Sequence, residues 1–223
     1  MTFFLPIFIF KPNLIIRFFK KTQMPYLHSK YEVPGDDNQN EVLPNLQGIT
    51  SIDVIHKVEF EGFLKAQYQL LEELTTHTKF DFAYIQRIHQ LSLKDLYDFA
   101  GQFRTVNMTK GGFLFPTAKF LPKICHDFDE RVLKSLPDYY QDKQQLIRDI
   151  AHVHAELLFI HPFREANGRV ARILANMMAV KQGYDFLGFY KITQRQFKQY
   201  IIAVQSAADH NYQPMTEIIS AIF

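Results

Sequence analysis

Apolar residues recur at three- and four-residue steps along most of the chain after residue 50, and this periodicity is typical of amphipathic α-helices. The first stripe follows Thr50 and Ser51, either of which can cap a helix, and another begins in a turn that contains Pro122. The pattern predicts an all-α fold. The residues that form the stripes are Phe63, Ala66, Leu70 and Leu74, then Ile124, Phe128, Val132 and Leu136, then Leu146, Ile150, Val153 and Leu157, and then Val170, Ile173, Leu174, Met177 and Met178.

Breaks in the periodicity predict where the helices begin and end. A helix opened by Asp81 should run through Ile88, and residues 95–99 should extend it. Two further helices should cross in the core, on either side of a short break at His161 and Pro162. The other expected bounds are a stop at Pro137 and Asp138 and two closing helices over residues 194–207 and 216–222.

One segment does not follow the helical pattern. Two short β-favouring runs, residues 104–110 and 113–116, flank Gly111 and Gly112, and this arrangement is typical of a β-hairpin. An isolated two-stranded hairpin is not stable from its own contacts. We therefore expect it either to pack on the helices as an ordinary cover or to offer an edge to a partner.

The first 23 residues differ in composition from the rest, with six Phe and no acidic residue. Their apolar run ends at Lys11 and Pro12 and the next is cut at Arg17, whereas a membrane-spanning helix needs about 20 apolar residues. The charge and cleavage pattern of a secretory signal is also missing. Two interpretations stay open: an amphipathic membrane-surface or disordered extension, or translation that starts at Met24. A membrane partner is not expected.

We divide the chain into an N-terminal extension with a loop-rich lead-in, residues 1–47, and one domain, residues 48–223. The net charge of +2 comes from the basic extension, and the remainder is slightly acidic. A duplex-binding protein needs a concentrated basic face, so no direct nucleic-acid partner is expected. The single cysteine, Cys125, excludes an intramolecular disulfide and a cysteine-clustered metal site, and it fits a reducing compartment. Because no recognition or secretion domain is appended, we expect a cytoplasmic protein, and translocation into another cell stays open.

The densest group of functional residue types is HPFREANGRVAR, His161–Arg172, at the junction of two predicted helices. Asn167 can cap the second helix, and Gly168 lets a ligand approach the backbone. The unpaired N–H groups of a helix's first turn bind phosphate together with the positive end of the helix dipole. Arg169 and Arg172 are three residues apart and can grip further phosphate oxygens from one side of the helix.

Two more side chains of this segment suit phosphate chemistry. Glu165 supplies a hard oxygen ligand beside the predicted phosphate site, as a Mg²⁺ ion that bridges phosphates requires. His161, with an ordinary pKa of about 6.5, can remove a proton from an incoming hydroxyl at neutral pH. Pro162 and Phe163 are assigned to scaffolding, since the first ends a helix and the second anchors the loop in the core.

These residues resemble the core motif of the Fic (filamentation induced by cAMP) family, H-x-F-x-[DE]-[GA]-N-G-R-x-x-R. The resemblance extends from about residue 96 to the closing helices. It implies a Fic-type helical bundle with a short β-hairpin flap over the active site, which agrees with the pattern described above. The motif positions are met by His161, Phe163, Glu165, Ala166, Asn167, Gly168, Arg169 and Arg172.

The resemblance implies that the protein is an adenylyltransferase. A Ser, Thr or Tyr hydroxyl of a target protein would attack the α-phosphate of ATP, and pyrophosphate would leave. His161 would be the base and Glu165 would hold Mg²⁺. The implied nucleotide-binding residues are Asn167, Gly168, Arg169 and Arg172. The flap, residues 105–120, would dock the target as an extra strand, and its implied docking residues are Thr105, Val106, Asn107, Lys110, Gly111, Gly112, Phe113 and Phe115.

Ala166 departs from the usual Gly of adenylyltransferases in this family and also occurs in a branch that phosphorylates its target. That branch replaces the following Gly by Lys, whereas Gly168 is kept here, so AMP transfer stays the favoured reaction. A kinase, or transfer from another nucleotide or a phosphocholine donor, remains an alternative.

Relatives are inhibited by a helix bearing [ST]-x-x-x-E-[GN], and no intact copy is present. Lys57 stands at the first position of one partial match, which ends in Glu61 and Gly62, and residues 206–211 lack the acid. We therefore hypothesise a toxin that is inhibited by a separate small antitoxin protein.

Two other function classes are alternatives to a transferase. His152, His154, Glu156 and His161 crowd one region, but two histidines two residues apart on a helix face different directions and HExxH is absent, so a metal hydrolase is disfavoured. A catalytically silent protein-binding module with this fold remains the non-enzymatic alternative.

Overall fold

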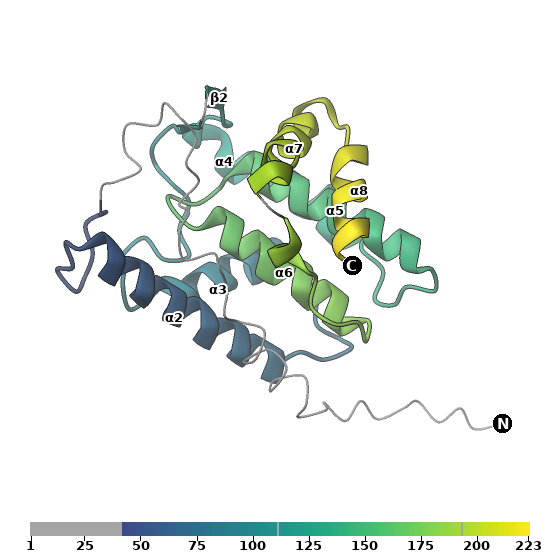
Figure 1. Cartoon of the computed structure of the whole chain (residues 1–223), viewed down its shortest axis with the longest axis horizontal. Helices are drawn as coiled ribbons and strands as arrows, with labels where there is room; N and C mark the ends of the chain where they lie inside the picture. Colours follow the sequence, from purple (N-terminus) through teal and green to yellow (C-terminus); the bar gives the residue numbers. More distant parts are fainter. Residues whose placement is uncertain (1–41, 111, 193) are drawn as a thin grey trace.

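The computed structural model describes residues 42–223 apart from Gly111 and Thr193, so the extension predicted over residues 1–23 lies outside the described residues. The described chain is a helical bundle with one β-hairpin (Figure 1), which confirms the predicted fold class. Its elements are α2 (Ile52–Glu72), α3 (Phe82–Leu93), β1 (Thr109–Lys110), β2 (Phe113–Leu114), α4 (Leu121–Arg131), α5 (Lys143–Ile160), α6 (Asn167–Lys181), α7 (Gln194–Gln205) and α8 (Gln213–Ile222).

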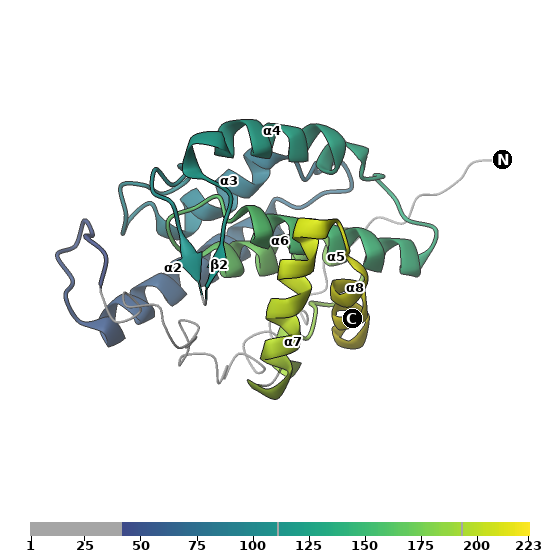
Figure 2. The same ribbon diagram turned by 90° about the horizontal axis from the view of Figure 1, so that it is seen from above.

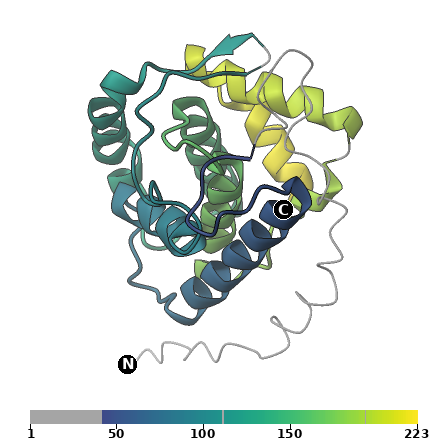
Figure 3. The same ribbon diagram turned by 90° about the vertical axis from the view of Figure 1, so that its left-hand side faces the viewer.

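Helix α6 lies in the middle of the bundle. It packs against α5, α3 and α2, while α7 and α8 pack on α5 (Figure 3). The facing sides of α5 and α6 are apolar and buried, with Ile150 and Ile160 meeting the layer that contains Val170 and Met177. The two helices predicted to meet in the core therefore do so. Across the described residues, no helix has the length and apolar content needed to cross a bilayer.

Local sequence signals account for several helix starts. The Asp81 carboxylate accepts a hydrogen bond of 2.8 Å from the Tyr84 N–H at the start of α3, and Asp142 caps α5 in the same way. Gly62 lets α2 and α3 approach closely, because a Cβ atom at this position would lie 2.1 Å from the Ser92 carbonyl oxygen. The α2–α3 pair therefore depends on a residue without a side chain.

Two predicted helix extensions are wrong. Residues 95–99 form turns, and α3 ends at Leu93 because the chain turns to bury Tyr97, which is 1% exposed. Helix α4 ends at Arg131, and a 3₁₀ turn follows that places Leu133 in the core. In both places burial of one apolar side chain outweighs continuation of the local helical pattern.

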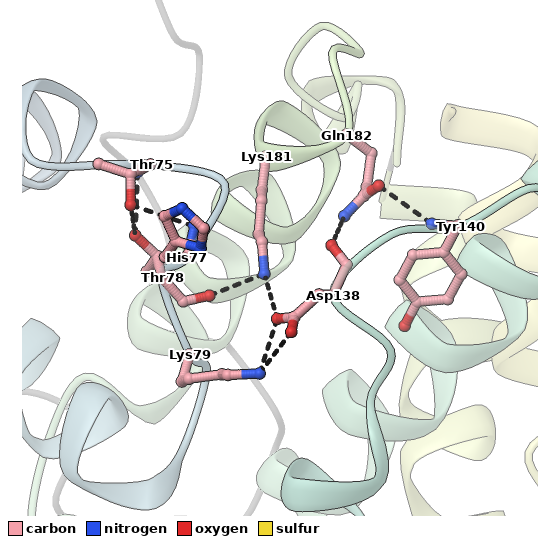
Figure 4. Close-up of polar contacts among 8 residues, drawn as sticks. All are labelled: Thr75, His77, Thr78, Lys79, Asp138, Tyr140, Lys181 and Gln182. Carbon is pink, nitrogen blue, oxygen red and sulfur yellow. Dashed lines mark hydrogen bonds and ion pairs between the residues drawn. The ribbon is translucent and has the colours of Figure 1, made fainter. Parts of the chain in front are cut away.

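A polar cluster fastens the far end of α6. Figure 4 shows Asp138 between two lysines, and its carboxylate accepts from Lys79 at 2.6 Å and from Lys181 at 3.2 Å. Lys181 also donates to the Thr78 carbonyl oxygen at 2.8 Å. A hollow of about 250 Å³ beside this cluster is lined by Lys181, at the opposite end of α6 from Asn167. It is therefore separate from the motif predicted to bind a nucleotide.

The hairpin stands at the end of the bundle where α6 begins (Figure 2). Its strands are antiparallel, with Thr109 opposite Leu114 and Lys110 opposite Phe113. Phe115 continues the pairing by donating its N–H to the Met108 carbonyl oxygen at 3.1 Å. The predicted hairpin is confirmed, and it packs against the loop that carries His161.

Candidate active site

The loop between α5 and α6 reverses the chain through two left-handed residues. His161 ends α5 at φ 51°, and Ala166 precedes α6 at φ 66°. Asn167 was expected to cap α6, but it is the first helical residue, and its side chain turns back to the loop instead. Its Oδ1 accepts from the Phe163 N–H at 2.9 Å and its Nδ2 donates to the Phe163 carbonyl oxygen at 2.8 Å. Asn167 therefore holds the loop closed.

The first turn of α6 offers backbone donors. The N–H groups of Arg169 and Val170 both donate to the Ala166 carbonyl oxygen at 3.0 Å. The N–H groups of Asn167 and Gly168 have no hydrogen-bond acceptor among the described residues. Two donors at the positive end of a 15-residue helix can bind an anion.

The His161 ring has a defined tautomer. Its Nδ1 lies 3.1 Å from the Leu158 carbonyl oxygen, which can only accept, so Nδ1 carries the proton and Nε2 is left as an acceptor. The ring stacks on Phe115 of the hairpin at 4.0 Å between centroids. Burial lowers the pKa of His161 to about 4, so the ring is neutral at physiological pH.

The two arginines of the motif have different surroundings. Arg169 donates to the Glu59 carboxylate of α2 at 2.8 Å and reaches Glu165 at 3.4 Å. Glu59 is 1% exposed and also accepts from the Tyr97 hydroxyl at 2.7 Å. Arg172, by contrast, has no ion pair with another described residue. The structure therefore does not join the two guanidinium groups to a common partner.

Sequence analysis did not identify Glu59, although a signal was present. Glu59 stands between Ile55 and Phe63 at four-residue steps, on the apolar stripe of α2. An acid on a buried stripe requires a partner, and the nearby motif arginine provides it. Glu165 is partly exposed, and its Oε1 accepts from the Ala166 N–H at 2.9 Å, so its carboxylate stays beside the start of α6.

His89 of α3 is a second residue that sequence analysis missed. Its Nδ1 accepts from the Gly101 N–H at 2.7 Å, so its Nε2 carries the proton and faces the Glu165 carbonyl oxygen at 3.2 Å. Its ring stacks on Phe163 at 4.1 Å. His89 thus stabilises the loop through its contacts with Phe163 and Glu165. No local sequence pattern marks His89, because these partners come from a distant part of the chain.

The predicted flap residues lie in and next to the hairpin. Thr105, Val106, Asn107 and Gly112 are exposed, while Gly111 lies outside the described residues. Lys110 and Phe113 are half-buried and Phe115 is buried. Within the described residues each strand pairs only with the other, so each has an outer edge.

The histidines that prompted the metal-hydrolase alternative do not converge. The His152 ring packs against the Tyr212 ring in a tilted arrangement, with 4.0 Å between centroids. His154 is buried, with Nε2 2.6 Å from the Tyr200 hydroxyl, and Glu156 accepts from the Tyr212 hydroxyl at 2.7 Å. In the described part of the chain, no three His, Cys, Asp or Glu side chains are grouped so that they could hold a metal ion.

Two buried histidines, His89 and His154, and the half-buried His161 predict a loss of stability in mild acid. Burial lowers the pKa of His89 to about 4, of His154 to about 3 and of His161 to about 4, from an ordinary value of 6.5. Their contribution is complete above pH 6.5 and is lost as the pH falls, because only the unfolded chain binds the protons. We expect the free energy of unfolding to drop by about 2 kcal/mol between pH 7 and pH 6.

Urea unfolding at several pH values measures this drop, and proton uptake on unfolding at pH 6 gives an independent count of the titrating groups. Equal unfolding free energies at pH 7 and pH 6 would show that these histidines titrate normally in the folded protein.

The sequence profile of the Fic/DOC family matches residues 79–179. Among curated proteins, the chain is 29% identical over 163 residues to the protein adenylyltransferase VbhT of Bartonella schoenbuchensis. That alignment covers 70% of this chain and 33% of VbhT, so the chain spans about a third of that relative's length.

Solved Fic domains share the fold. The N-terminal FIC domain of Bep8 from Bartonella sp. 1-1C has a TM-score of 0.69 at 19% identity and covers 86% of this chain and 93% of its own. BepC of Bartonella tribocorum, solved with bound AMPPNP, has a TM-score of 0.65 at 20% identity and covers 83% of this chain and 96% of its own. The loop between α5 and α6 and the start of α6 both lie within residues 79–179, the segment of this chain that matches the Fic/DOC family.

Proposed function

We propose that this protein transfers AMP from ATP to a Ser, Thr or Tyr hydroxyl of a target protein. One observation carries the proposal: a neutral His161 with an accepting Nε2 precedes, within one loop, a helix start whose Asn167 and Gly168 N–H groups are available to an anion. A base and an anion site so close together suit attack of a hydroxyl on a phosphate.

In the proposed reaction, His161 Nε2 accepts the proton of the target hydroxyl as its oxygen bonds to the α-phosphorus. The bond between that phosphorus and the oxygen bridging to the β-phosphate breaks, and pyrophosphate leaves with the electron pair. The Asn167 and Gly168 N–H groups bind phosphate oxygens, and Arg169 and Arg172 bind the β- and γ-phosphates. Arg169 would do so while held by Glu59.

Magnesium fits this arrangement. Mg²⁺ in nucleotide sites is bound by one or two carboxylates together with phosphate oxygens and water, and Glu165 keeps a carboxylate beside the start of α6. Glu165 would hold the ion, which would neutralise charge on the phosphates. No cluster of several acidic residues is required.

The hairpin is proposed to dock the target. Thr105, Val106 and Asn107 lead into it, and Lys110, Gly112, Phe113 and Phe115 belong to its strands and turn or follow directly. An added target strand would pair with an open edge through backbone hydrogen bonds. We propose residues 48–223 as the catalytic domain.

Two comparisons support the proposal. VbhT is named a protein adenylyltransferase, and BepC binds AMPPNP, an ATP analogue. The chain spans only about a third of VbhT. We therefore base the proposed activity on the His161 loop and the start of α6 in this chain as well as on the similarity to VbhT.

Labelled ATP tests the proposal. The purified chain is incubated with Mg²⁺, a cell lysate and ATP labelled at either the α- or the γ-phosphate. We expect label on protein from the α-position alone. Label from the γ-position alone would identify a kinase, the alternative that Ala166 keeps open, and label from neither would indicate a silent binding module.

We also propose that the protein is a toxin controlled by a separate small antitoxin. Glu61, the acid of the partial inhibitory motif, is exposed on α2. The purified chain should therefore transfer label without any activating change, and Glu61→Gly should leave the rate within twofold. A chain that is inactive alone and becomes active with Glu61→Gly would show that the inhibition is internal.

A further inference from the structure

Arg104 joins three segments of the chain through one buried guanidinium group. Its Nε donates to the His161 carbonyl oxygen at 2.7 Å, and its Nη1 donates to the Val106 carbonyl oxygen at 2.7 Å. Its Nη2 donates to the Pro116 carbonyl oxygen. Val106 precedes the hairpin and Pro116 follows it. The Arg104 side chain therefore ties both ends of the flap to the left-handed residue that carries the proposed base.

The surroundings of Arg104 are unusual for an arginine. The residue is 3% exposed, yet none of the ion pairs among the described residues includes it. Burial of a cation without a counter-ion costs free energy, which charge-assisted hydrogen bonds to carbonyl groups offset only in part. An apolar residue could fill the space without this cost, but it could not donate hydrogen bonds to three carbonyl groups.

Further contacts connect the same parts. The Arg104 backbone N–H donates to the Pro162 carbonyl oxygen at 2.9 Å. The backbone and the side chain of Arg104 therefore bind two successive loop residues, Pro162 and His161. The Phe115 ring, one residue before Pro116, stacks on the His161 ring. Any shift of the flap relative to the loop would therefore disturb both the Arg104 hydrogen bonds and the environment of the imidazole.

Resting on the proposed function, we propose that Arg104 is a positioning residue that sets the register of the target-docking flap against His161. A target strand on the flap places its hydroxyl wherever the flap lies. Nε2 must reach that hydroxyl at hydrogen-bond distance, and a displacement of about 1 Å can cost a hundredfold in rate.

Arg104→Lys tests this while keeping the positive charge near His161. A lysine ammonium is a point donor and does not reproduce the planar fork. We expect α-label transfer to fall by about tenfold to a hundredfold, with the affinity for Mg-ATP within twofold. Arg131→Lys, an exposed arginine at the end of α4, is the matched control and should change neither.

A second readout does not depend on activity. The half-buried His161 ring stacks on Phe115 of the flap, and this desolvation lowers its pKa to about 4. Lys110, Arg104 and Glu165 are the charged groups that act on it. Loosening the flap should move the His161 pKa in Arg104→Lys at least one unit toward 6.5, as measured by NMR of the imidazole nitrogens. A role in stability alone would leave this titration unchanged.

The outcomes separate the two proposals. If the wild-type protein transfers no label, the proposed function fails, while the titration still tests Arg104. An unchanged titration together with an unchanged rate in Arg104→Lys overturns the positioning role. Should that variant not fold, the rate of hydrogen exchange at Arg104 Nε in the wild-type protein tests the positioning role. Slow exchange is expected, and exchange as fast as that of an exposed arginine would contradict the proposed hydrogen bonds of Arg104.

Discussion

Replacing His161 with Ala should lower the rate of α-label transfer by about a hundredfold to ten-thousandfold, the usual contribution of a general base. The reason is that Nε2 is the group positioned to take the hydroxyl proton, since Nδ1 is committed to the Leu158 carbonyl oxygen. Transfer is measured with α-labelled ATP and lysate, and the affinity for Mg-ATP is measured separately.

The nucleotide affinity of His161→Ala should stay within a few-fold, because the backbone donors of α6 remain in place. His126→Ala is the matched control, since His126 is exposed on α4, away from the loop. A His161→Ala variant that keeps full transfer would remove the proposed base, whereas equal losses in both variants would point to a nonspecific effect.

Arg169→Met should destabilise the fold by about 3–5 kcal/mol, the cost of breaking a buried ion pair from one side. It leaves the Glu59 carboxylate, 1% exposed on its side chain, with a hydrogen bond from the Tyr97 hydroxyl but with no ion pair to a described residue. Because Arg169 itself is 27% exposed, the carboxylate is the member of the pair that suffers most. Urea unfolding measures the loss.

Arg148→Met is the matched control for Arg169→Met. Arg148 pairs with Asp142 at 3.5 Å, with both side chains 57% exposed, so its loss should cost less than about 1 kcal/mol. The double variant Glu59→Leu with Arg169→Met should regain only part of the stability, since apolar residues replace the ion pair but leave the buried Tyr97 hydroxyl without its acceptor. If Arg169→Met lowers the free energy of unfolding no more than Arg148→Met does, Glu59 is not an uncompensated buried charge in the Arg169→Met variant.

Features with local causes could be predicted from the sequence. The stripe through Phe63, Ala66 and Leu70 gave a helix at the right place, the Asp81 cap was correct, and the Gly pair identified the hairpin. The loop motif also lies at the junction of α5 and α6, as the break at Pro162 indicated.

The contacts that fix the candidate site are not local. Arg169 pairs with Glu59, which lies 110 residues earlier in the sequence. Arg104 donates to the carbonyl oxygen of His161, 57 residues later, and the His89 ring contacts the carbonyl oxygen of Glu165, 76 residues later. Two of these end on backbone carbonyl groups, which every residue has, so no side-chain pattern can mark them. The left-handed backbone of His161 was equally hidden, since histidine seldom adopts it.

The central claim is that a triphosphate binds at the start of α6 with its α-phosphate beside His161. A crystal structure of the chain with Mg²⁺ and AMPPNP measures this directly. We expect phosphate oxygens at about 3 Å from the Asn167 and Gly168 N–H nitrogens, with the α-phosphorus on the Nε2 side of the ring. A nucleotide bound elsewhere, or an α-phosphate out of reach of a hydroxyl held by Nε2, would contradict the account.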